Sequence, residues 1–492
     1  MELSMEPVLI KSNKNIIGQI AAVFFIEASI TTAFAVFFSG LSLYLTHKEL
    51  YSKESAAIMT GLFLSAHYFL QLVGGVIANR LITYKKLYCL GSIMSVVGCV
   101  LLAYGANLKV GLSLFLMSSL VTNVCLRMFI TRLFDDSQVV GRRIAFVWNY
   151  VGMNLGFLMG GFLAGYYTIK NNYFNLYIIM SILIVISVIL TLVFIKNTES
   201  DYSIKRSAVS QVSLSSLIML SLVGLMIILF NYVDAAQKSL TIISIVAFVG
   251  LLHYGYRNSA LTEKNNFMKF SLYSALSVCF WTIYMLTPTA IMQIIDNDVQ
   301  QTMFGITIAP QWIVNIDTIV ILIGAPTLAY FLNRQTMRNT NLLGTDSYFT
   351  RSFLFTTIAF VALLVGLYSF VDQGKLPIIA ILAFLIFLTL GEILISPISD
   401  SLVGELVPVS MRELMTGISS VKIGIGGLLA SSIANKFLLP YVDKDGLVGS
   451  NLSHLQSSVI GICVLLAILT ATIYFSFARY KTRESFSVNI RA

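Results

Sequence analysis

Five ionisable residues stand inside stretches that are otherwise apolar and long enough to form membrane-spanning helices. They are Glu27, Arg127, Glu392, Asp400 and Lys422, with Asp317 near the start of another such stretch. A charged side chain at the centre of a bilayer costs ~2.5–3.5 kcal/mol on insertion scales, so such residues are few and usually face a cavity or a partner. The pattern predicts groups that bind a polar solute or exchange protons within a membrane.

Three polar residues share one side of a predicted helix. Glu392, Ser396 and Asp400 are spaced four residues apart, and residues at that spacing lie above one another on a helix. Pro397 removes a backbone hydrogen bond and predicts a break or bend beside Glu392. This favours a gate or binding element built around a carboxylate. The alternative is a kinked packing helix in which a neighbour neutralises Glu392.

Lys422 lies near the middle of the next apolar stretch, at the depth of Asp400 if both are counted from the loop that joins the two stretches. We therefore predict a Lys422–Asp400 ion pair, which is either a structural lock or a switchable part of coupling. Replacing Asp400 with Asn would then impair folding or transport.

Other residues allow two interpretations each. Arg127 either extends to the membrane interface or anchors a carboxylate. His67 either packs through a hydrogen bond or relays protons. Trp281 and Tyr284 either line a cavity or pack against lipid and other helices.

Composition places all these residues in a membrane protein. The chain has 492 residues, of which 57% are hydrophobic and 11% are charged, against about 25% charged in a soluble domain. The net charge of +9 does not indicate nucleic-acid binding, because the basic residues occupy short loops and form no basic face. Residues 1–15 are polar and the first apolar run is too long for the core of a signal peptide, so we expect no cleavable signal peptide.

Chemistry that needs metals or cofactors is not indicated. The cysteines stand inside apolar stretches without metal-site spacing and are interpreted as packing residues. The sequence contains no nucleotide-binding loop, nucleophile elbow or His/Cys ligand cluster. We therefore expect neither an enzyme nor a cofactor.

Apolar stretches of ~20 residues, the length that crosses the hydrocarbon core, predict fourteen spans. They are 16–46, 56–79, 87–106, 110–131, 143–168, 173–195, 212–232, 238–256, 267–295, 311–332, 352–371, 377–403, 412–436 and 453–478. An even number places both termini on one side. Because most Lys and Arg residues fall on that side, the positive-inside rule predicts that both termini are cytoplasmic.

The predicted spans group as six, two and six. The expected parts are a cytoplasmic N-terminus (1–15), a six-helix bundle (16–196), a linker with two extra transmembrane helices (197–266), a second six-helix bundle (267–480) and a cytoplasmic tail (481–492). Two six-helix bundles around a central site predict an all-α membrane protein with the major facilitator fold. The segment GGVIANRLITYKK from Gly74 to Lys86 resembles the loop motif of that superfamily, with Asn79 where an Asp is usual.

Two further motifs are more specific. Residues 391–417, GEILISPISDSLVGELVPVSMRELMTG, contain Gly391, Glu392, Ser396, Pro397, Leu406, Pro408, Met415 and Gly417, and residues 149–156, NYVGMNLG, contain Tyr150, Asn154 and Gly156. These resemble the Gly-Glu-Leu…Ser-Pro and Phe-Tyr-x-x-Ile-Asn-x-Gly motifs of the proton-dependent oligopeptide transporter family. The segment from Phe280 to Trp312 is similar to the family's seventh core helix and the following loop. The resemblance extends from about Gly18 to Arg479.

The resemblance assigns roles to single residues. Glu392 matches the glutamate that faces the peptide amino group, Ser396 a serine one turn away, and Asn154 an asparagine that contacts the substrate. Glu27 matches the first acidic residue of the family's Glu-x-x-Glu-Arg motif. The remaining family positions are changed: Ile30 and Thr31 replace the second Glu and the Arg, Asn123 stands near the place of a lysine, Met285 replaces a glutamate and Ser419 a tryptophan. The chain therefore resembles a divergent member with a rebuilt site.

The resemblance implies a proton-coupled symporter of small peptides or a related charged solute, in which residues 16–196 rock against residues 267–480. The candidate substrate-binding residues are Glu392, Ser396, Asn154, Tyr150, Arg127, Lys422, Trp281 and Tyr284, and the candidate proton-coupling or gating residues are Glu27, Glu392, Asp317, Asp400 and Lys422. The expected partners are the solute, protons and the lipid bilayer, and the expected state is a monomer in the cytoplasmic (inner) membrane.

Two other functions stay open. The same fold could carry a polycarboxylate or a metal-chelating metabolite, inward or outward, with Lys422 and Arg127 as its anchors. A membrane receptor or scaffold without transport is the other class. Buried charges that converge on one cavity would favour transport, and separately paired charges would favour a scaffold.

Overall fold

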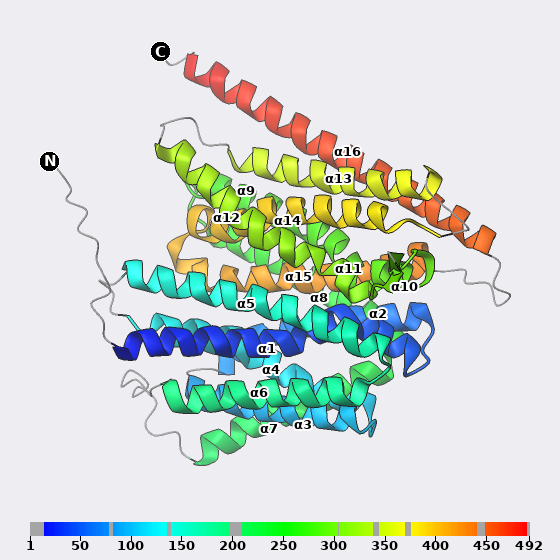
Figure 1. Cartoon of the computed structure of the whole chain (residues 1–492). Helices are drawn as coiled ribbons and strands as arrows, with labels where there is room; N and C mark the ends of the chain where they lie inside the picture. The colour runs from blue at the N-terminus through cyan, green and yellow to red at the C-terminus, as the bar shows by residue number, and fades with distance from the viewer. Residues whose placement is uncertain are drawn as a thin grey trace. The chain divides into compact units, whose positions relative to one another are not determined.

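The computed structural model describes residues 14–77, 82–134, 139–195, 209–303, 305–337, 344–369, 375–439 and 448–489. The first half of the chain forms helices that follow the predicted spans. They are α1 (Lys14–His47), α2 (Lys53–Ile77), α3 (Tyr84–Ala103), α4 (Leu108–Thr131), α5 (Val139–Ile169), α6 (Tyr173–Phe194) and α7 (Val209–Asn231) (Figure 1). Asn79 and Arg80 of the predicted loop motif lie outside the described residues.

The second half contains longer and more broken elements. They are α8 (Val233–Asn258), α9 (Lys264–Tyr284), the π-helix η2 (Thr287–Ile291), α10 (Met292–Asp298), β1 (Thr302–Met303), β2 (Ile306–Thr307), α11 (Pro310–Val314), α12 (Ile316–Met337), α13 (Thr345–Ser369), α14 (Ile378–Leu406), the 3₁₀-helix η3 (Val409–Met411), α15 (Arg412–Ile433), the π-helix η4 (Ala434–Leu438) and α16 (Val448–Asn489). The strands β1 and β2 pair antiparallel as a short hairpin.

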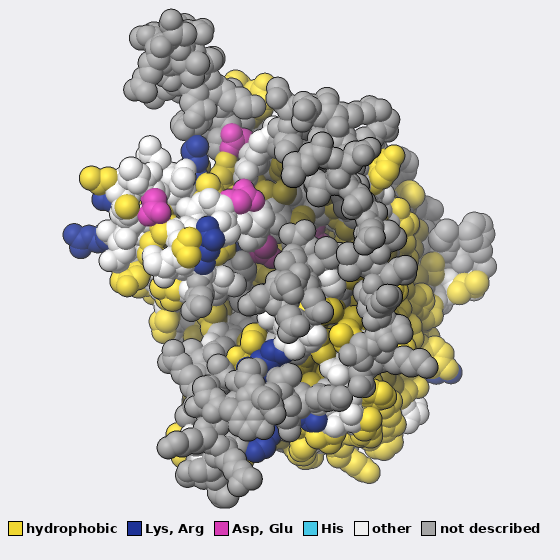
Figure 2. Space-filling view, turned by 90° about the vertical axis from the view of Figure 1, so that its left-hand side faces the viewer, with side chains coloured by type: hydrophobic (Ala, Val, Ile, Leu, Met, Phe, Trp, Pro, Cys, Tyr) yellow, Lys and Arg dark blue, Asp and Glu magenta, His cyan; other side chains and the backbone are white. Residues whose placement is uncertain are grey.

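Within the described residues, thirteen helices are long and apolar enough to cross a membrane. The predicted span 143–168 corresponds to α5, a helix of 31 residues outside that group of thirteen. Large apolar side chains are exposed on α6 and α8, for example Ile189 and Val246. Figure 2 shows hydrophobic side chains along the right-hand and lower edges of the described surface, and most of the charged side chains in the left half of the view. The exposed apolar side chains of α6 and α8 fit hydrocarbon better than water.

Backbone contacts divide the chain into two units. Unit 1 comprises Met1–Gly40 and Ala66–Tyr232, and unit 2 comprises Leu41–Ser65 and Val233–Ala492. The division passes through α1 and α2, so the end of α1 and the start of α2 pack with the second half of the chain. The two extra helices are also separated, because α7 packs on α4 in unit 1 whereas α8 packs on α15 in unit 2. The predicted boundaries 16–196 and 267–480 stay a prediction.

Small residues allow the helices of unit 1 to approach closely. A Cβ atom at Gly91 would lie 2.6 Å from the carbonyl oxygen of Met117, and one at Gly98 would lie 2.6 Å from that of Gly111. Between these two contacts, the Ser95 hydroxyl donates to the Phe115 carbonyl at 2.7 Å. Packing of this kind is how helices associate where hydrocarbon surrounds them. It joins α3 and α4 into one layer, on which α6 also packs.

Polar contacts fix the end of α1 within unit 2. The Gln293 side-chain amide donates to the Ser42 hydroxyl at 2.8 Å and to its carbonyl at 3.0 Å. One turn beyond each residue, His47 Nε2 lies 2.8 Å from Asp296 Oδ2. These contacts attach α1 to α10 and hold the residues that follow the π-helix η2 in place.

The breaks in the helices differ from the prediction. The expected continuous span 267–295 is interrupted at Thr287–Ile291, where the π-helix contains Pro288. Pro397 does not interrupt α14, which continues through it to Leu406, and the predicted bend beside Glu392 stays a prediction. A proline inside a helix removes one hydrogen bond but does not determine whether the chain stops there, since neighbouring groups in a membrane protein can satisfy the freed carbonyl.

The contact of α2 with α4 provides a test of this packing. A Cβ atom at Gly74 would lie 1.7 Å from the Leu120 carbonyl oxygen, whereas nothing lies within 4 Å of one at Gly224. Overpacking a close contact costs ~1–3 kcal/mol. We expect Gly74→Ala to lower the melting temperature of the detergent-purified protein by several degrees and Gly224→Ala to leave it unchanged. Equal melting temperatures for the two variants would contradict the close packing at Gly74.

Candidate functional site

Two carboxyl groups and a tyrosine meet inside unit 2. The Tyr284 hydroxyl, at the end of α9, donates to Asp317 Oδ2 at 2.6 Å. Asp317 lies in the first turn of α12, and its second oxygen accepts a hydrogen bond from Thr318 at 3.1 Å. The Glu392 carboxyl on α14 is within hydrogen-bonding reach of the same Tyr284 hydroxyl. It also interacts electrostatically with the Asp317 carboxyl. Three helices therefore bring Glu392, Asp317 and Tyr284 together as a carboxyl cluster.

The carboxyl cluster has fewer hydrogen-bond donors than it needs. Glu392 Oε2 is buried and has no hydrogen-bond partner among the described residues. The Tyr284 hydroxyl carries one proton and can donate to one carboxylate at a time. Two negative charges this close in a buried site are unfavourable together. The cluster is therefore best satisfied when it binds a proton.

Lys422 is held elsewhere in unit 2. Its Nζ donates to the Ser399 hydroxyl at 2.5 Å, and Ser399 in turn contacts the Ser277 hydroxyl at 2.8 Å. Lys422 is 2% exposed, whereas Asp400 is exposed and acts on Lys422 only through its charge. The predicted Lys422–Asp400 ion pair is therefore wrong in this structure. Adjacent side chains on a helix point about 100° apart. Equal depth in the membrane therefore did not make Asp400 face Lys422, and the neighbouring Ser399 faces it instead.

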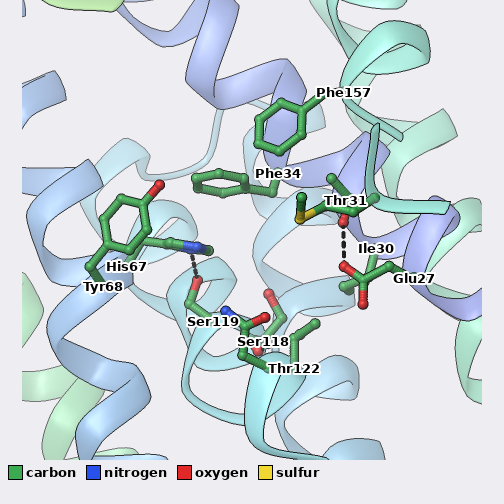
Figure 3. A pocket seen from close by; sticks show the side chains of 12 residues that line it. Glu27, Ile30, Thr31, Phe34, His67, Tyr68, Ser118, Ser119, Thr122 and Phe157 are labelled. Carbon is green, nitrogen blue, oxygen red and sulfur yellow. Dashed lines mark hydrogen bonds between the residues drawn. The ribbon is translucent and has the colours of Figure 1, made fainter. Parts of the chain in front are cut away.

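Unit 1 contains a separate pocket between α1, α2, α4 and α5. Its lining residues are Glu27, Ile30, Thr31, Phe34, His67, Tyr68, Ser118, Ser119, Thr122, Asn123, Met153 and Phe157. Its empty volume is about 570 Å³, including the open mouth. In Figure 3, Glu27 and Thr31 lie on one side, His67 and Tyr68 on the other, and the Phe34 ring between them.

The carboxylate in this unit 1 pocket has neutral hydrogen-bond donors. Thr31 donates to Glu27 Oε1 at 2.9 Å, and the Asn149 side chain is within hydrogen-bonding reach of the same carboxylate. Glu27 is 4% exposed. Arg127 acts on Glu27 through its charge, but it is exposed and does not belong to the lining.

The opposite wall of the unit 1 pocket is aromatic. His67 Nδ1 shares a hydrogen bond with the Ser119 hydroxyl at 2.6 Å. The Phe34 ring stacks on the imidazole with centroids 3.7 Å apart and an interplanar angle of 18°. Phe157 meets Phe34 edge-on at 6.1 Å. The hydrogen bond and the stacking hold the imidazole as a packed wall of the pocket.

Several residues predicted from the sequence lie near the sites without joining them. The Asn154 amide donates to the Tyr150 carbonyl at 2.9 Å, and neither residue lines the unit 1 pocket. Ser396 is half-buried one turn from Glu392. Trp281 packs edge-on against Tyr284 with ring centroids 5.3 Å apart, and Gly426 lies against its backbone. Their substrate contacts stay a prediction.

The aromatic rings of the unit 1 pocket were not predicted from the sequence. Phe34, Tyr68 and Phe157 are not distinguished from other aromatic residues by composition or spacing. A signal was available for Phe34, because it stands seven residues after Glu27 and therefore on the same side of α1. Thr31 and Asn123, noted earlier as neutral replacements for basic residues, both line the pocket.

Thirteen membrane-length helices in the described residues, with carboxyl groups inside both units, define a polytopic membrane protein. Residues 21–431 match the family model of the Major Facilitator Superfamily. The chain belongs to that superfamily, which confirms the predicted fold class.

Curated relatives lie in its peptide-permease branch, which confirms the predicted resemblance. Dipeptide and tripeptide permease B of Salmonella typhimurium is 22% identical over 416 residues, which cover 81% of this chain and 83% of the relative. The permease of the same name from Xenorhabdus bovienii is 21% identical over 458 residues, which cover 90% of this chain and 92% of the relative.

Solved structures share the fold. A peptide transporter of the oligopeptide-transporter family in complex with sulfate superimposes with a TM-score of 0.77 at 16% identity, covering 94% of this chain and 95% of that one. A family member in complex with 5-aminolevulinic acid has a TM-score of 0.74 at 14% identity, covering 92% and 96%.

The Lys422 contact gives a test that separates the observed partner from the predicted one. Ser399→Ala removes the hydroxyl that accepts from a buried ammonium group, and an unsatisfied buried charged donor costs ~1–3 kcal/mol or more. We expect a clear drop in melting temperature for Ser399→Ala and a small one for Asp400→Asn. Ser401→Ala, an exposed serine bonded within its own helix, is the control. A larger drop in melting temperature for Asp400→Asn than for Ser399→Ala would instead support the Lys422–Asp400 ion pair.

Proposed function

We propose that this protein is a secondary active transporter that couples the entry of small peptides, or of a related charged solute, to protons by alternating access. The relatives named dipeptide and tripeptide permease support the solute class. The carboxyl cluster of Glu392, Asp317 and Tyr284 carries the proposal. A buried group that is best satisfied with a bound proton is what a proton-driven carrier requires.

The cluster suggests how coupling works. When Glu392 and Asp317 together bind one proton, one carboxylate stays negatively charged. The Tyr284 hydroxyl can then donate its hydrogen bond to that carboxylate. When the substrate binds while the cluster holds its proton, proton and substrate cross the membrane together. Both leave to water once the site opens to the cytoplasm. A buried carboxyl that loses its charge also allows the site to close at lower cost.

The proposed setting is the cytoplasmic membrane, with both termini cytoplasmic. The distribution of Lys and Arg between the predicted loops supports this orientation. The protein would act as a monomer, in which the two predicted bundles rock around the transport path. A polycarboxylate cargo has less support, because Arg127 does not line the unit 1 pocket and Lys422 is engaged by Ser399.

Uptake into proteoliposomes under an imposed pH gradient tests the proposal. We expect labelled di- and tripeptides to accumulate in a gradient-dependent way, and Glu392→Gln to lower gradient-driven uptake about tenfold or more, in line with loss of a buried, uniquely placed carboxyl. Because glutamine cannot release a proton, exchange of peptide across the membrane without a gradient should persist in this variant.

Glu405→Gln is the matched control, since Glu405 is an exposed acidic residue on the same helix. It should transport like the unchanged protein. Uptake in Glu392→Gln that is still stimulated by the gradient to the original extent would contradict the assignment of the carboxyl cluster.

A further inference from the structure

Among the described residues, the lining of the unit 1 pocket contains an acidic residue and no Lys or Arg, and the proposed function does not explain this negative charge. Of its twelve lining residues, all within the described part of the chain, Glu27 contributes the carboxylate and none is Lys or Arg. The other lining side chains are hydroxyls, one amide, aromatic or imidazole rings, and the apolar Ile30 and Met153. A substrate carboxylate placed here would meet a like charge across a short distance, and in a buried site that repulsion is weakly screened.

The donors to Glu27 leave room for a further partner. Thr31 supplies one hydrogen bond at 2.9 Å, and Asn149 lies within reach of another. An ionised carboxylate offers about four acceptor positions on its two oxygens. Neutral donors position the group without cancelling its charge, and the charge of Arg127 comes from outside the lining. The carboxylate is therefore oriented and still able to accept from a cation.

The imidazole does not serve as a cation in this pocket. Its Nδ1 is occupied by the Ser119 hydroxyl, and its face is covered by Phe34 at 3.7 Å. A protonated imidazole packed in this way would be a buried charge without a counter-charge at its own wall, which is costly. The same packing makes His67 part of an aromatic surface with Phe34, Tyr68 and Phe157.

Rings opposite a carboxylate form a recognisable binding chemistry. An ammonium group is attracted to the faces of aromatic rings within ~6 Å of their centroids. In Figure 3, the Phe34 ring lies between the Glu27 side and the His67–Tyr68 side of the pocket. A ligand that enters would place an ammonium group against Glu27 while its apolar body contacts the rings. An anionic group of the same size would gain the ring contacts only.

We propose that the unit 1 pocket is a binding site for an organic ammonium group attached to an apolar or aromatic body, and that it discriminates against carboxylates. This inference deepens the proposed function, because it names the charge of the substrate end that unit 1 accepts. It predicts that the preferred solutes are amines, or peptides whose carboxyl end is masked or absent.

Two probes of equal length test the proposal on the full chain in lipid nanodiscs. They are 2-phenylethylammonium and 3-phenylpropionate, which share the aromatic body and differ in charge. By isothermal titration calorimetry at pH 7, we expect the dissociation constant of the amine to be at least about tenfold lower than that of the acid, the difference that a single favourable charge contact gives. In Glu27→Gln this difference should fall to about twofold or less.

Further variants keep the result specific to this pocket. Glu27→Asp retains the charge and should keep part of the preference, which separates loss of charge from loss of fold. Glu405→Gln alters an exposed acidic residue outside the unit 1 pocket and should keep the full preference. Equal or tighter binding of the acid, binding of neither probe, or a preference that survives Glu27→Gln would overturn the proposal.

Failure of this proposal is distinguishable from failure of the proposed function. The calorimetric preference requires neither a proton gradient nor peptide uptake. A preference for the amine that depends on Glu27, in a protein that moves no peptide, supports the pocket and rejects the peptide cargo. Gradient-driven peptide uptake in a protein that prefers the acid rejects the pocket and leaves the transporter.

Discussion

A carboxylate removed from water must find a hydrogen-bond donor, a counter-charge or a proton, and both units are arranged around that requirement. In unit 2, the Tyr284 hydroxyl donates to Asp317, and the neighbouring Glu392 has one oxygen without a partner among the described residues. No basic residue is among the described groups that act on the charge of Glu392. In unit 1, Glu27 receives donors from a threonine and an asparagine. The helices that carry these groups can be apolar elsewhere because the polar contacts are concentrated at two places.

The carboxyl cluster of unit 2 and the unit 1 pocket satisfy their carboxylates in different ways, which suggests that they have different functions. The carboxyl cluster of unit 2 contains two acids and one donor, so a proton is the simplest way to satisfy it. The unit 1 pocket contains one acid with neutral donors and an aromatic wall, so a cation can complete it. We therefore propose that the carboxyl cluster binds the proton and that the unit 1 pocket recognises an ammonium group.

The sequence predicted the spans well, because long apolar runs leave a signal that loops cannot imitate. It also identified Glu27, Glu392 and Asp317 as acids on membrane-length helices, since charge is conspicuous in such runs. Glu27 is buried, and Glu392 and Asp317 are half-buried. The direction in which a side chain points around its helix was harder to predict than its depth. Lys422 lies at the expected depth, but its partner is Ser399 rather than the adjacent Asp400. Which proline interrupts a helix was also not predictable, because Pro288 and Pro397 differ in their surroundings and not in their chemistry. The ring wall of Phe34, Tyr68 and Phe157 comes from three helices, and no pattern along one helix contains it.

The central claim is that buried carboxyls carry the protons that drive transport. It is tested most directly by recording the internal pH of proteoliposomes with a trapped fluorescent indicator while peptide is added outside. The account predicts that peptide entry acidifies the interior in the unchanged protein and that Glu392→Gln moves peptide without acidification. Peptide entry with no change of internal pH in the unchanged protein would contradict it.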